Sequence, residues 1–309
     1  MVRRTLTLCL ALALLEAGAA DFVLAADRFS FRISPTYFSG DYGTGIETTL
    51  TFVPFDFRWD YSRARLKVIV PYVSISDAGR VTFTGAGPGP SVQSPAASSS
   101  DPSPMDPPGS GGVPAGPSGT PPAPAPAPPA GGGPPAPPPG FIRSENVGTS
   151  QSGLGDVRLA ADLYLLKGSA TRPWITLGPF FKLATADESK GLGTGENDYG
   201  AGLGLTAPLG GGWQAYADAG YQVTGDPPGI DYRNVRKVGL GLGKTLKDRI
   251  TWEGYYEDRN SLLDGVANLR DASVGLRIDA AAGTTLGFTL FKGLSGSAED
   301  WGLGLSLGR

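Results

Sequence analysis

The carboxylates are the side chains of this chain that could take part in catalysis or metal binding, and several of them lie four to six residues apart in the sequence. Asp156 with Asp162, and Glu253 with Glu257, have the residue types of a hydrolase acid–base pair or of a calcium site. In extended strands, however, each pair projects to one face with its members about 14–20 Å apart, which is too far to share a proton or a metal ion. Basic residues surround both pairs, so cross-strand ion pairs are the better interpretation.

A third acidic group consists of Asp187, Glu188, Glu196 and Asp198, and it flanks a predicted loop. These residues offer oxygen ligands for a divalent ion at the surface. Oxygen-ligand loops usually show a denser acidic spacing than this one. We therefore predict no metal site, and no cofactor, in this chain.

Two residue types that most enzyme sites need are scarce. The chain has no His and a single Cys, Cys9. This excludes Ser-His and Cys-His nucleophile pairs, His general bases, His-ligated metals, disulfide frameworks and Cys-based zinc sites. Its 26 Lys+Arg nearly balance its 29 Asp+Glu, for a net charge of −3, so no basic face for nucleic acid is expected. The composition therefore argues against an enzyme and against a nucleic-acid-binding protein.

The N-terminus has the three parts of a secretory signal. Two arginines at positions 3 and 4 precede a mainly apolar run, and a stretch of small residues ends the segment. The apolar run is about 10 residues long, whereas a helical membrane span needs roughly 20. We therefore predict that residues 1–25 form a signal peptide, with cleavage near Ala19/Ala20 or at Ala25.

Residues 85–140 differ in composition from the rest of the chain. They hold 20 of its 28 prolines and 12 of its 47 glycines, show no apolar periodicity and cannot bury enough surface to fold. The segment is either a linker between two domains or a long loop within one. Because the strand pattern before it continues after it, we expect one domain, 26–309, interrupted by this disordered Pro/Gly/Ala-rich loop.

Outside that segment, stretches of about ten residues alternate apolar with polar positions. Around residue 275, for example, Val274 and Leu276 lie on one face and Arg277 lies on the other. Period-two alternation of this length predicts half-exposed strands that are long enough to cross a bilayer when tilted. Twelve strands are expected, at 28–38, 46–59, 64–74, 154–166, 173–185, 197–208, 213–225, 234–246, 249–259, 270–280, 283–292 and 299–308.

The connections between these strands alternate in length. The odd-numbered connections are long and include 85–140, whereas the even-numbered ones are short. Long loops on one rim, short turns on the other and an even strand number are typical of outer-membrane barrels, while a soluble sandwich has no reason to sort its loops. We therefore predict an all-β fold, a transmembrane antiparallel β-barrel of about 12 strands with one long disordered extracellular loop.

The polarity of the two strand faces predicts which one meets lipid. The apolar face continues from strand to strand, and the opposite face mixes Gly, Thr and charges of both signs, as a lumen does. Aromatic residues at strand ends are expected to form interfacial girdles: Trp59, Tyr72, Trp174, Trp213, Tyr221, Trp252 and Trp301. The charged lumen residues are the candidates for setting selectivity: Arg32, Arg65, Lys67, Arg158, Asp162, Lys182, Asp218, Lys237, Glu253, Glu257 and Arg277.

Glycines repeat on the predicted lumen face, in the Gly-x-Gly runs at 200–204 and 239–243. A nucleotide-binding fingerprint needs a strand–turn–helix setting, which these runs lack. Their low bulk is expected to leave space in the bore. A twelve-stranded barrel is intermediate in width between filled eight-stranded barrels and aqueous porins, so a narrow conduit is expected.

A family resemblance is carried by three runs: SGLGDVRLAADLYLL, WITLGPFFKLATADESKGLGTGENDYGAGLGLTAPLGGGWQAYADAGY and, before the insert, TFVPFDFRWDYSRARLKVIVPYVSI. They resemble the phenol-degradation (MetA-pathway) outer-membrane transporter family over most of 46–309 apart from the insert. The resemblance implies a barrel that passes small, often aromatic or hydrophobic compounds and has no assigned catalytic residues. The insert and the C-terminal Leu-Gly-Arg309, which stands where such barrels usually end in an aromatic residue, depart from the family pattern.

Together these observations predict a channel in the cell outer membrane for the passive passage of small solutes. Its partners would be outer-membrane lipid, the solute and the barrel-assembly machinery. Three alternatives belong to other classes: a structural or surface-display barrel with a plugged lumen, an outer-membrane hydrolase, which the absence of His disfavours, and a soluble periplasmic sandwich.

Overall fold

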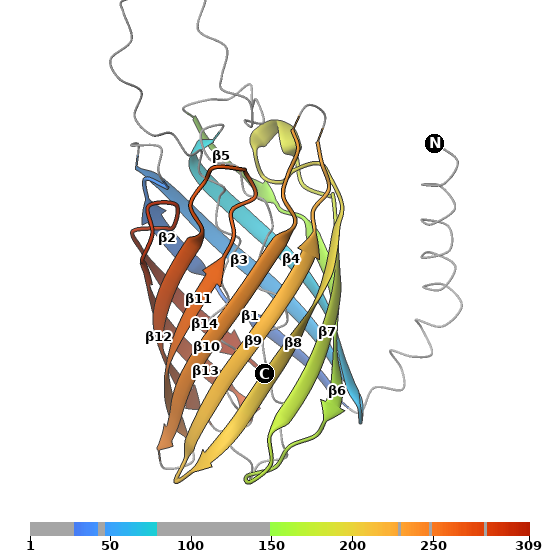
Figure 1. The fold of residues 1–309 in the computed structure, drawn as a ribbon, viewed down its shortest axis with the longest axis vertical. Helices are drawn as coiled ribbons and strands as arrows, with labels where there is room; N and C mark the ends of the chain where they lie inside the picture. The colour runs from blue at the N-terminus through green and yellow to red at the C-terminus, as the bar shows by residue number, and fades with distance from the viewer. Residues whose placement is uncertain (1–27, 43–46, 79–148, 228–229, 247–248, 281–282) are drawn as a thin grey trace, which may run out of the picture.

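A computed structural model describes residues 28–42, 47–78, 149–227, 230–246, 249–280 and 283–309 (Figure 1). The strands of these residues form one antiparallel sheet. The predicted signal peptide and the predicted loop 85–140 lie outside the described residues. The strand segments are β1 (Arg28–Ile33), β2 (Thr36–Gly40), β3 (Thr48–Asp60), β4 (Ala64–Ala78), β5 (Thr149–Leu154), β6 (Val157–Leu166), β7 (Trp174–Leu183), β8 (Asp198–Gly210), β9 (Trp213–Val223), β10 (Val235–Leu246), β11 (Ile250–Arg259), β12 (Leu269–Asp279), β13 (Thr285–Gly293) and β14 (Trp301–Gly308).

These fourteen segments make twelve barrel strands, because two strands are each interrupted once. The break between β1 and β2 falls at Ser34-Pro35, and the break between β5 and β6 falls at Gly155-Asp156. Both halves of the first strand pair with β3, and both halves of the other pair with β4. The expected number of strands and their positions along the chain are confirmed.

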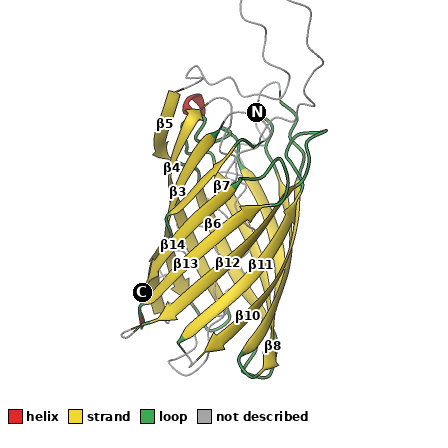
Figure 2. Cartoon of the chain, turned by 90° about the vertical axis from the view of Figure 1, so that its left-hand side faces the viewer, coloured by secondary structure: helices red, strands yellow, loops and turns green. Residues whose placement is uncertain are grey.

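The sheet closes on itself through its first and last strands. β14 pairs with β13 on one side and with β1 and β2 on the other, with Arg32 opposite Gly308 and Ser39 opposite Trp301. Closure gives each of the twelve barrel strands two neighbours, except along β5, which pairs only with β4 where it extends above the barrel wall (Figure 2). A closed sheet is the only β-structure that satisfies its backbone hydrogen bonds inside a bilayer.

Connection lengths sort onto two rims, as the sequence predicts. The connections at the lower rim in Figure 1 are short, such as 61–63 and 211–212, and both ends of the described chain lie there. The end of β4 and the start of β5, between which residues 79–148 fall in the sequence, lie at the upper rim, as do the connections 184–197 and 260–268. In outer-membrane barrels the short turns are periplasmic and the long loops are extracellular, so the upper rim is the outer one.

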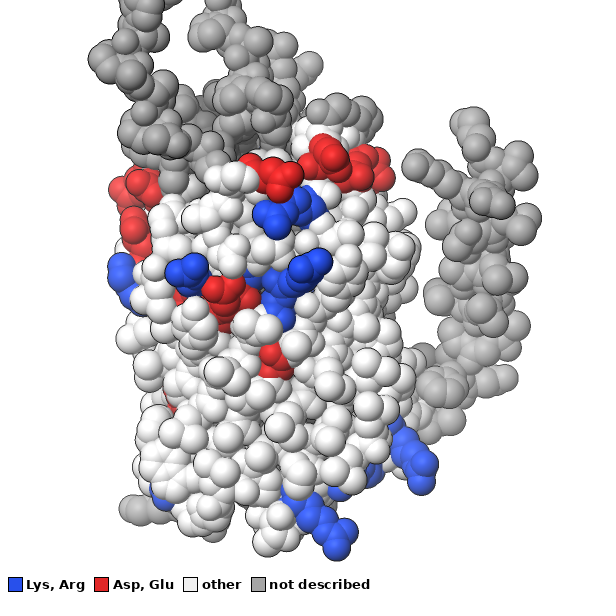
Figure 3. Space-filling model, viewed as in Figure 1, with Lys and Arg blue, Asp and Glu red and all other residues white. Residues whose placement is uncertain are grey.

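Outward-facing side chains are apolar along most of the strand length. On β10, Leu240 is 62% exposed, while its neighbours Gly239 and Gly241 lie on the inner face. Figure 3 shows charged side chains over the upper part of the visible face and at its lower rim, with a mostly uncharged surface between them. This surface has the composition that a lipid-facing band requires. Among the described residues, no helix is long and apolar enough to cross a membrane.

Aromatic pairs mark both margins of this band. Trp213 and Trp252 meet edge to face at the short-turn rim, with ring centroids 5.4 Å apart, and Tyr37 packs against Trp301 near the upper rim, also at 5.4 Å. Trp174, which the sequence assigns to a girdle, is different. It is opposite the buried Thr206 on the inner face, because it is eight residues before Lys182 on the same strand and period-two alternation puts both on one face.

The lipid-facing band predicts a depth-dependent cost for charge. Leu240→Arg, near the middle of β10, is expected to destabilise the folded barrel by about 2–4 kcal/mol, and Leu246→Arg, at the end of the same strand, by no more than about 1 kcal/mol. Urea unfolding of the two variants in phospholipid vesicles measures both costs. Equal costs at the two positions would contradict the assignment of this face to lipid.

Candidate functional site

The candidate site is the barrel lumen, and the strand ladder places all eleven predicted charged residues on its inner face. Nine of them are buried, each no more than 7% exposed, whereas Arg32 and Arg158 are half-buried. The guanidinium of Arg158 lies over the ring of Phe180, 3.8 Å from the ring centroid. These residues do not form one cluster, and the ion pairs divide them into separate groups at different heights.

The first group lies in the half of the lumen nearest the short turns, on β3, β4 and β6. Lys67 Nζ is 2.8 Å from Asp162 Oδ1, and both side chains are buried. The adjacent pairs are Arg65 with Asp60 at 2.5 Å and Arg58 with Asp56 at 2.6 Å. The sequence-based selection missed Asp56, Arg58 and Asp60, although their alternation with Phe55 and Phe57 on β3 carries the signal.

The second group lies at the upper rim and is centred on Lys182. Its ammonium contacts Asp198 Oδ2 at 2.9 Å and Asp156 Oδ2 at 3.2 Å, and it donates a hydrogen bond to Thr194 Oγ1 at 3.1 Å. Asp156 also accepts hydrogen bonds from two backbone N–H groups at the start of the β7–β8 loop. Lys182 on β7 therefore contacts β8, the break between β5 and β6, and the β7–β8 loop.

A third group joins β9, β10 and β11. Lys237 lies between Glu257 Oε2, at 3.1 Å, and Asp218 Oδ2, at 3.3 Å. The hydroxyl of Tyr255 donates a hydrogen bond to Asp218. Neighbouring strands supply opposite charges here, which lowers the cost of burying each one.

Glu253 differs from the other lumen carboxylates. It is 2% exposed, and neither carboxylate oxygen has a hydrogen-bond partner among the described residues. The ladder sets it between Gly243 and Gly275, which contribute no side chains. Arg277 on the next strand pairs instead with Asp279, at 3.3 Å. Within the described part of the lumen, Glu253 is therefore a buried carboxyl group without a direct counter-charge.

Aromatic rings pack against the lumen glycines and fill the space beside them. A Cβ on Gly239 or Gly241 would collide with the ring system of Tyr255, and a Cβ on Gly243 would be 2.7 Å from the hydroxyl of Tyr216. The expectation that these glycines leave space in the bore is therefore wrong at 239–243. A glycine backbone lets a ring lie flat against the wall, which a larger residue would prevent.

An apolar cluster occupies the inner face at the upper rim and was not predicted. Its buried members are Phe38, Leu50, Val73, Ile75, Leu192 and Phe291. Five of them come from strands, whereas Leu192 comes from the β7–β8 loop. The sequence carries a signal for it, because the third expected strand is apolar on both faces around Val73. The lumen wall is thus apolar near the outer rim on β2–β4 and charged below.

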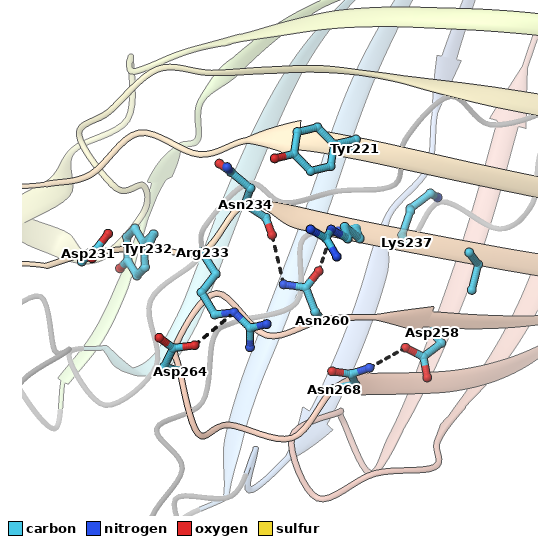
Figure 4. Close-up of a pocket in the computed structure, with 12 residues that line it drawn as sticks. Tyr221, Asp231, Tyr232, Arg233, Asn234, Lys237, Asp258, Asn260, Asp264 and Asn268 are labelled. Carbon is cyan, nitrogen blue, oxygen red and sulfur yellow. Dashed lines mark hydrogen bonds and ion pairs between the residues drawn. The ribbon is translucent and has the colours of Figure 1, made fainter.

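A separate pocket of about 610 Å³ lies at the upper ends of β9–β12, between the β9–β10 and β11–β12 loops (Figure 4). Its lining is polar and carries both signs of charge, with Arg233 paired to Asp264 at 3.2 Å. Burial raises the pKa of Tyr232 to about 12, so its hydroxyl stays protonated at neutral pH. Within the described part of the chain, no group of three or more His, Cys, Asp or Glu side chains could hold a metal ion.

Comparison with known proteins assigns the family. The model of the family described as "Putative MetA-pathway of phenol degradation" matches residues 118–308. The chain belongs to this family. No curated protein matches its sequence.

Solved structures resemble the chain at low sequence identity. The COG4313 outer membrane channel from Pseudomonas putida F1 matches with a TM-score of 0.56 and 12% identity, over 91% of this chain and 94% of that one. The NanC porin matches with a TM-score of 0.46 and 8% identity, over 90% of this chain and 97% of that one. The CymD monoaromatic hydrocarbon channel matches with a TM-score of 0.41 and 9% identity, over 95% of this chain and 91% of that one. The first of these matches shows that the fold is that of an outer-membrane β-barrel.

The buried pair of Lys67 and Asp162 yields a stability prediction. Asp162→Asn leaves the ammonium of Lys67 buried without a counter-charge, and it is expected to cost about 3–5 kcal/mol of unfolding free energy. The double variant Lys67→Met/Asp162→Leu removes both charges and is expected to regain most of that loss.

Unfolding of the refolded protein by guanidinium measures these changes. Asp264→Asn, which breaks an exposed pair with Arg233, is the control and should leave the unfolding free energy nearly unchanged. A cost for Asp162→Asn no larger than that of the control would contradict a structural role for the buried pair.

Proposed function

We infer that this protein is a passive outer-membrane channel for small solutes, including aromatic or hydrophobic ones. The observation that supports this most strongly is the closed barrel with a polar inner face. Its inner wall carries an apolar section at the outer rim and charged groups along its length. A barrel that serves only as an anchor has no need for this division of its inner wall.

The described residues suggest how passage would be controlled. The apolar cluster favours solutes that gain from leaving water. The fixed charges below it act through the field that they create in a narrow, low-dielectric space. Most of these charges have an oppositely charged partner on the same strand or on an adjacent one, whereas Glu253 has none. The function needs no covalent step and no catalytic residue.

A structural or surface-display barrel with a plugged lumen is the second candidate. The burial of nine lumen charges favours it, because side chains that line an open aqueous pore are exposed to water. In that function the barrel anchors the Pro-rich segment at the cell surface.

Planar-bilayer recording separates the two candidates. For the channel we expect stable single-channel steps from detergent-extracted, refolded protein, recorded with and without residues 85–140. A change in conductance on deletion would assign a gating or plugging role to that segment. The absence of steps from protein that shows the heat-modifiable gel shift of a folded barrel would contradict the channel and favour the anchor.

Glu253 yields a prediction about ion preference. Its carboxyl oxygens have no hydrogen-bond partner among the described residues, so its charge depends on pH. At pH 9, where the carboxyl is ionised, the channel should pass K⁺ more readily than Cl⁻, and Glu253→Gln should move the permeability ratio toward one. Reversal potentials in a KCl gradient measure this ratio. Glu188→Gln, on an exposed loop at the rim, is the matched control and should leave it unchanged. If Glu253→Gln left the K⁺/Cl⁻ permeability ratio unchanged, Glu253 would have no role in ion selectivity.

A further inference from the structure

The apolar cluster at the upper rim consists of five strand residues and one loop residue that packs against them. Leu50, Val73 and Ile75 are fully buried on β3 and β4, and the rings of Phe38 and Phe291 meet edge to face with centroids 5.2 Å apart. We call this wall, made by Phe38, Leu50, Val73, Ile75 and Phe291, the apolar cup. Leu192, from the β7–β8 loop, packs into the cup and has no exposed surface.

The wall and the loop both depend on glycine for this packing. A Cβ on Gly153 of β5 would be 2.9 Å from Leu192 Cδ1, so a larger residue there would push the end of the leucine side chain aside. In the loop, Gly191 and Gly195 have φ values of 70° and 72°, a left-handed conformation that favours glycine. Gly193 lies between them, where a Cβ would be 2.8 Å from the carboxylate of Asp156.

Polar contacts hold the loop at its edges, outside the cup. Lys182 donates a hydrogen bond to Thr194, two residues after Leu192, and is itself held by Asp156 and Asp198. At the other side, a single turn of 3-10 helix, Glu188–Lys190, is capped by Asp187. It lies at the upper rim beside β4 and β5 (Figure 2). The hydrogen bond that Ser189 donates lowers the pKa of Asp187, so the cap is ionised at neutral pH.

The apolar composition of the cup indicates the kind of ligand that it would bind. Apolar burial has no directional requirement, so a small apolar molecule of the size of a leucine side chain or a benzene ring satisfies the same surface. The cup also lies at the outer rim, where a solute from outside arrives first. The leucine comes from a loop with three glycines in five residues, 191–195, which can rearrange at lower cost than a strand.

We propose that the apolar cup is a binding site for small apolar or aromatic solutes, occupied in the resting state by Leu192, and that the solute displaces the β7–β8 loop. The proposal rests on the proposed channel function and names the site where the solute first binds. Lys182 holds the same loop to the wall through Thr194, so displacement of Leu192 must work against this hydrogen bond.

Site-specific thiol labelling tests this directly. In a chain in which Cys9 is replaced by serine, Leu192→Cys gives a single thiol, buried while the loop is seated. With the protein refolded in lipid vesicles, we expect toluene to raise the rate of labelling by a methanethiosulfonate reagent about tenfold. Sodium benzoate, which carries the same ring with a charge, is expected to have a much smaller effect.

Two variants complete the labelling experiment. Lys190→Cys places the thiol on an exposed part of the same loop and should be labelled quickly with or without toluene. Adding Lys182→Met to Leu192→Cys removes the anchor, so the thiol at position 192 should become reactive without toluene. A labelling rate at position 192 that toluene does not alter, or a toluene effect of equal size at position 190, would overturn the proposal.

A second measurement does not depend on the cysteine variant. Leu192→Ala removes most of the competing side chain, so calorimetry should show toluene binding about tenfold more tightly than in the unaltered protein. Leu209→Ala, at the short-turn end of β8, is the matched control and should bind as the unaltered protein does. Equal affinity for Leu192→Ala and the unaltered protein would also overturn the proposal.

Failure of the cup and failure of the channel give different results. Binding and labelling require no ion flow, so solute-dependent labelling in a protein without conductance would retain the cup and reject the channel. Conductance without any labelling response would retain the channel and reject the cup.

Discussion

Backbone hydrogen bonding in the membrane is the constraint on which the rest of this structure depends. Hydrocarbon offers no partner for an N–H or C=O group, so a membrane-spanning sheet must close. Here the closure is made by β14 with β1 and β2, on either side of a break at Ser34-Pro35. That break does not open the ladder, because the carbonyl of Pro35 accepts a hydrogen bond from the N–H of Leu305 at 2.9 Å.

Closure gives each strand one face toward lipid and one toward the lumen, and it brings charges into a confined space. Burying an ion is costly unless it is paired, which accounts for the arrangement of Lys67, Lys182 and Lys237. Each has at least one carboxylate partner on a neighbouring strand. Glu253 departs from this rule, and an unpartnered buried carboxyl group that a stable fold tolerates is a candidate for function.

The lumen combines two ways of discriminating between solutes. Charged groups act at a distance and respond to the charge of the solute, whereas the apolar cup acts by contact and responds to size and polarity. The two sections share their strands, since β3 carries Leu50 near one rim and Arg58 near the other. The β7–β8 loop joins them, because Leu192 packs into the cup while Thr194 accepts a hydrogen bond from Lys182.

The amino-acid sequence by itself determined the twelve strands, the sorting of long and short connections, and the face that each strand turns toward lipid. These features follow from period-two alternation and turn composition, which are local properties of the chain. For the same reason the eleven charged residues could be assigned to the lumen face before their partners were known. Trp174 was misplaced because an aromatic residue at a strand end resembles a girdle residue whichever face it occupies.

Only the tertiary structure decided which lumen groups meet. Lys67 and Asp162 are 95 residues apart, and their pairing depends on the stagger between β4 and β6, which alternation does not encode. The insertion of Leu192 and the packing of Tyr216 and Tyr255 against glycines have the same origin. They depend on how strands distant in sequence curve around a common axis, and the closed barrel alone fixes that geometry.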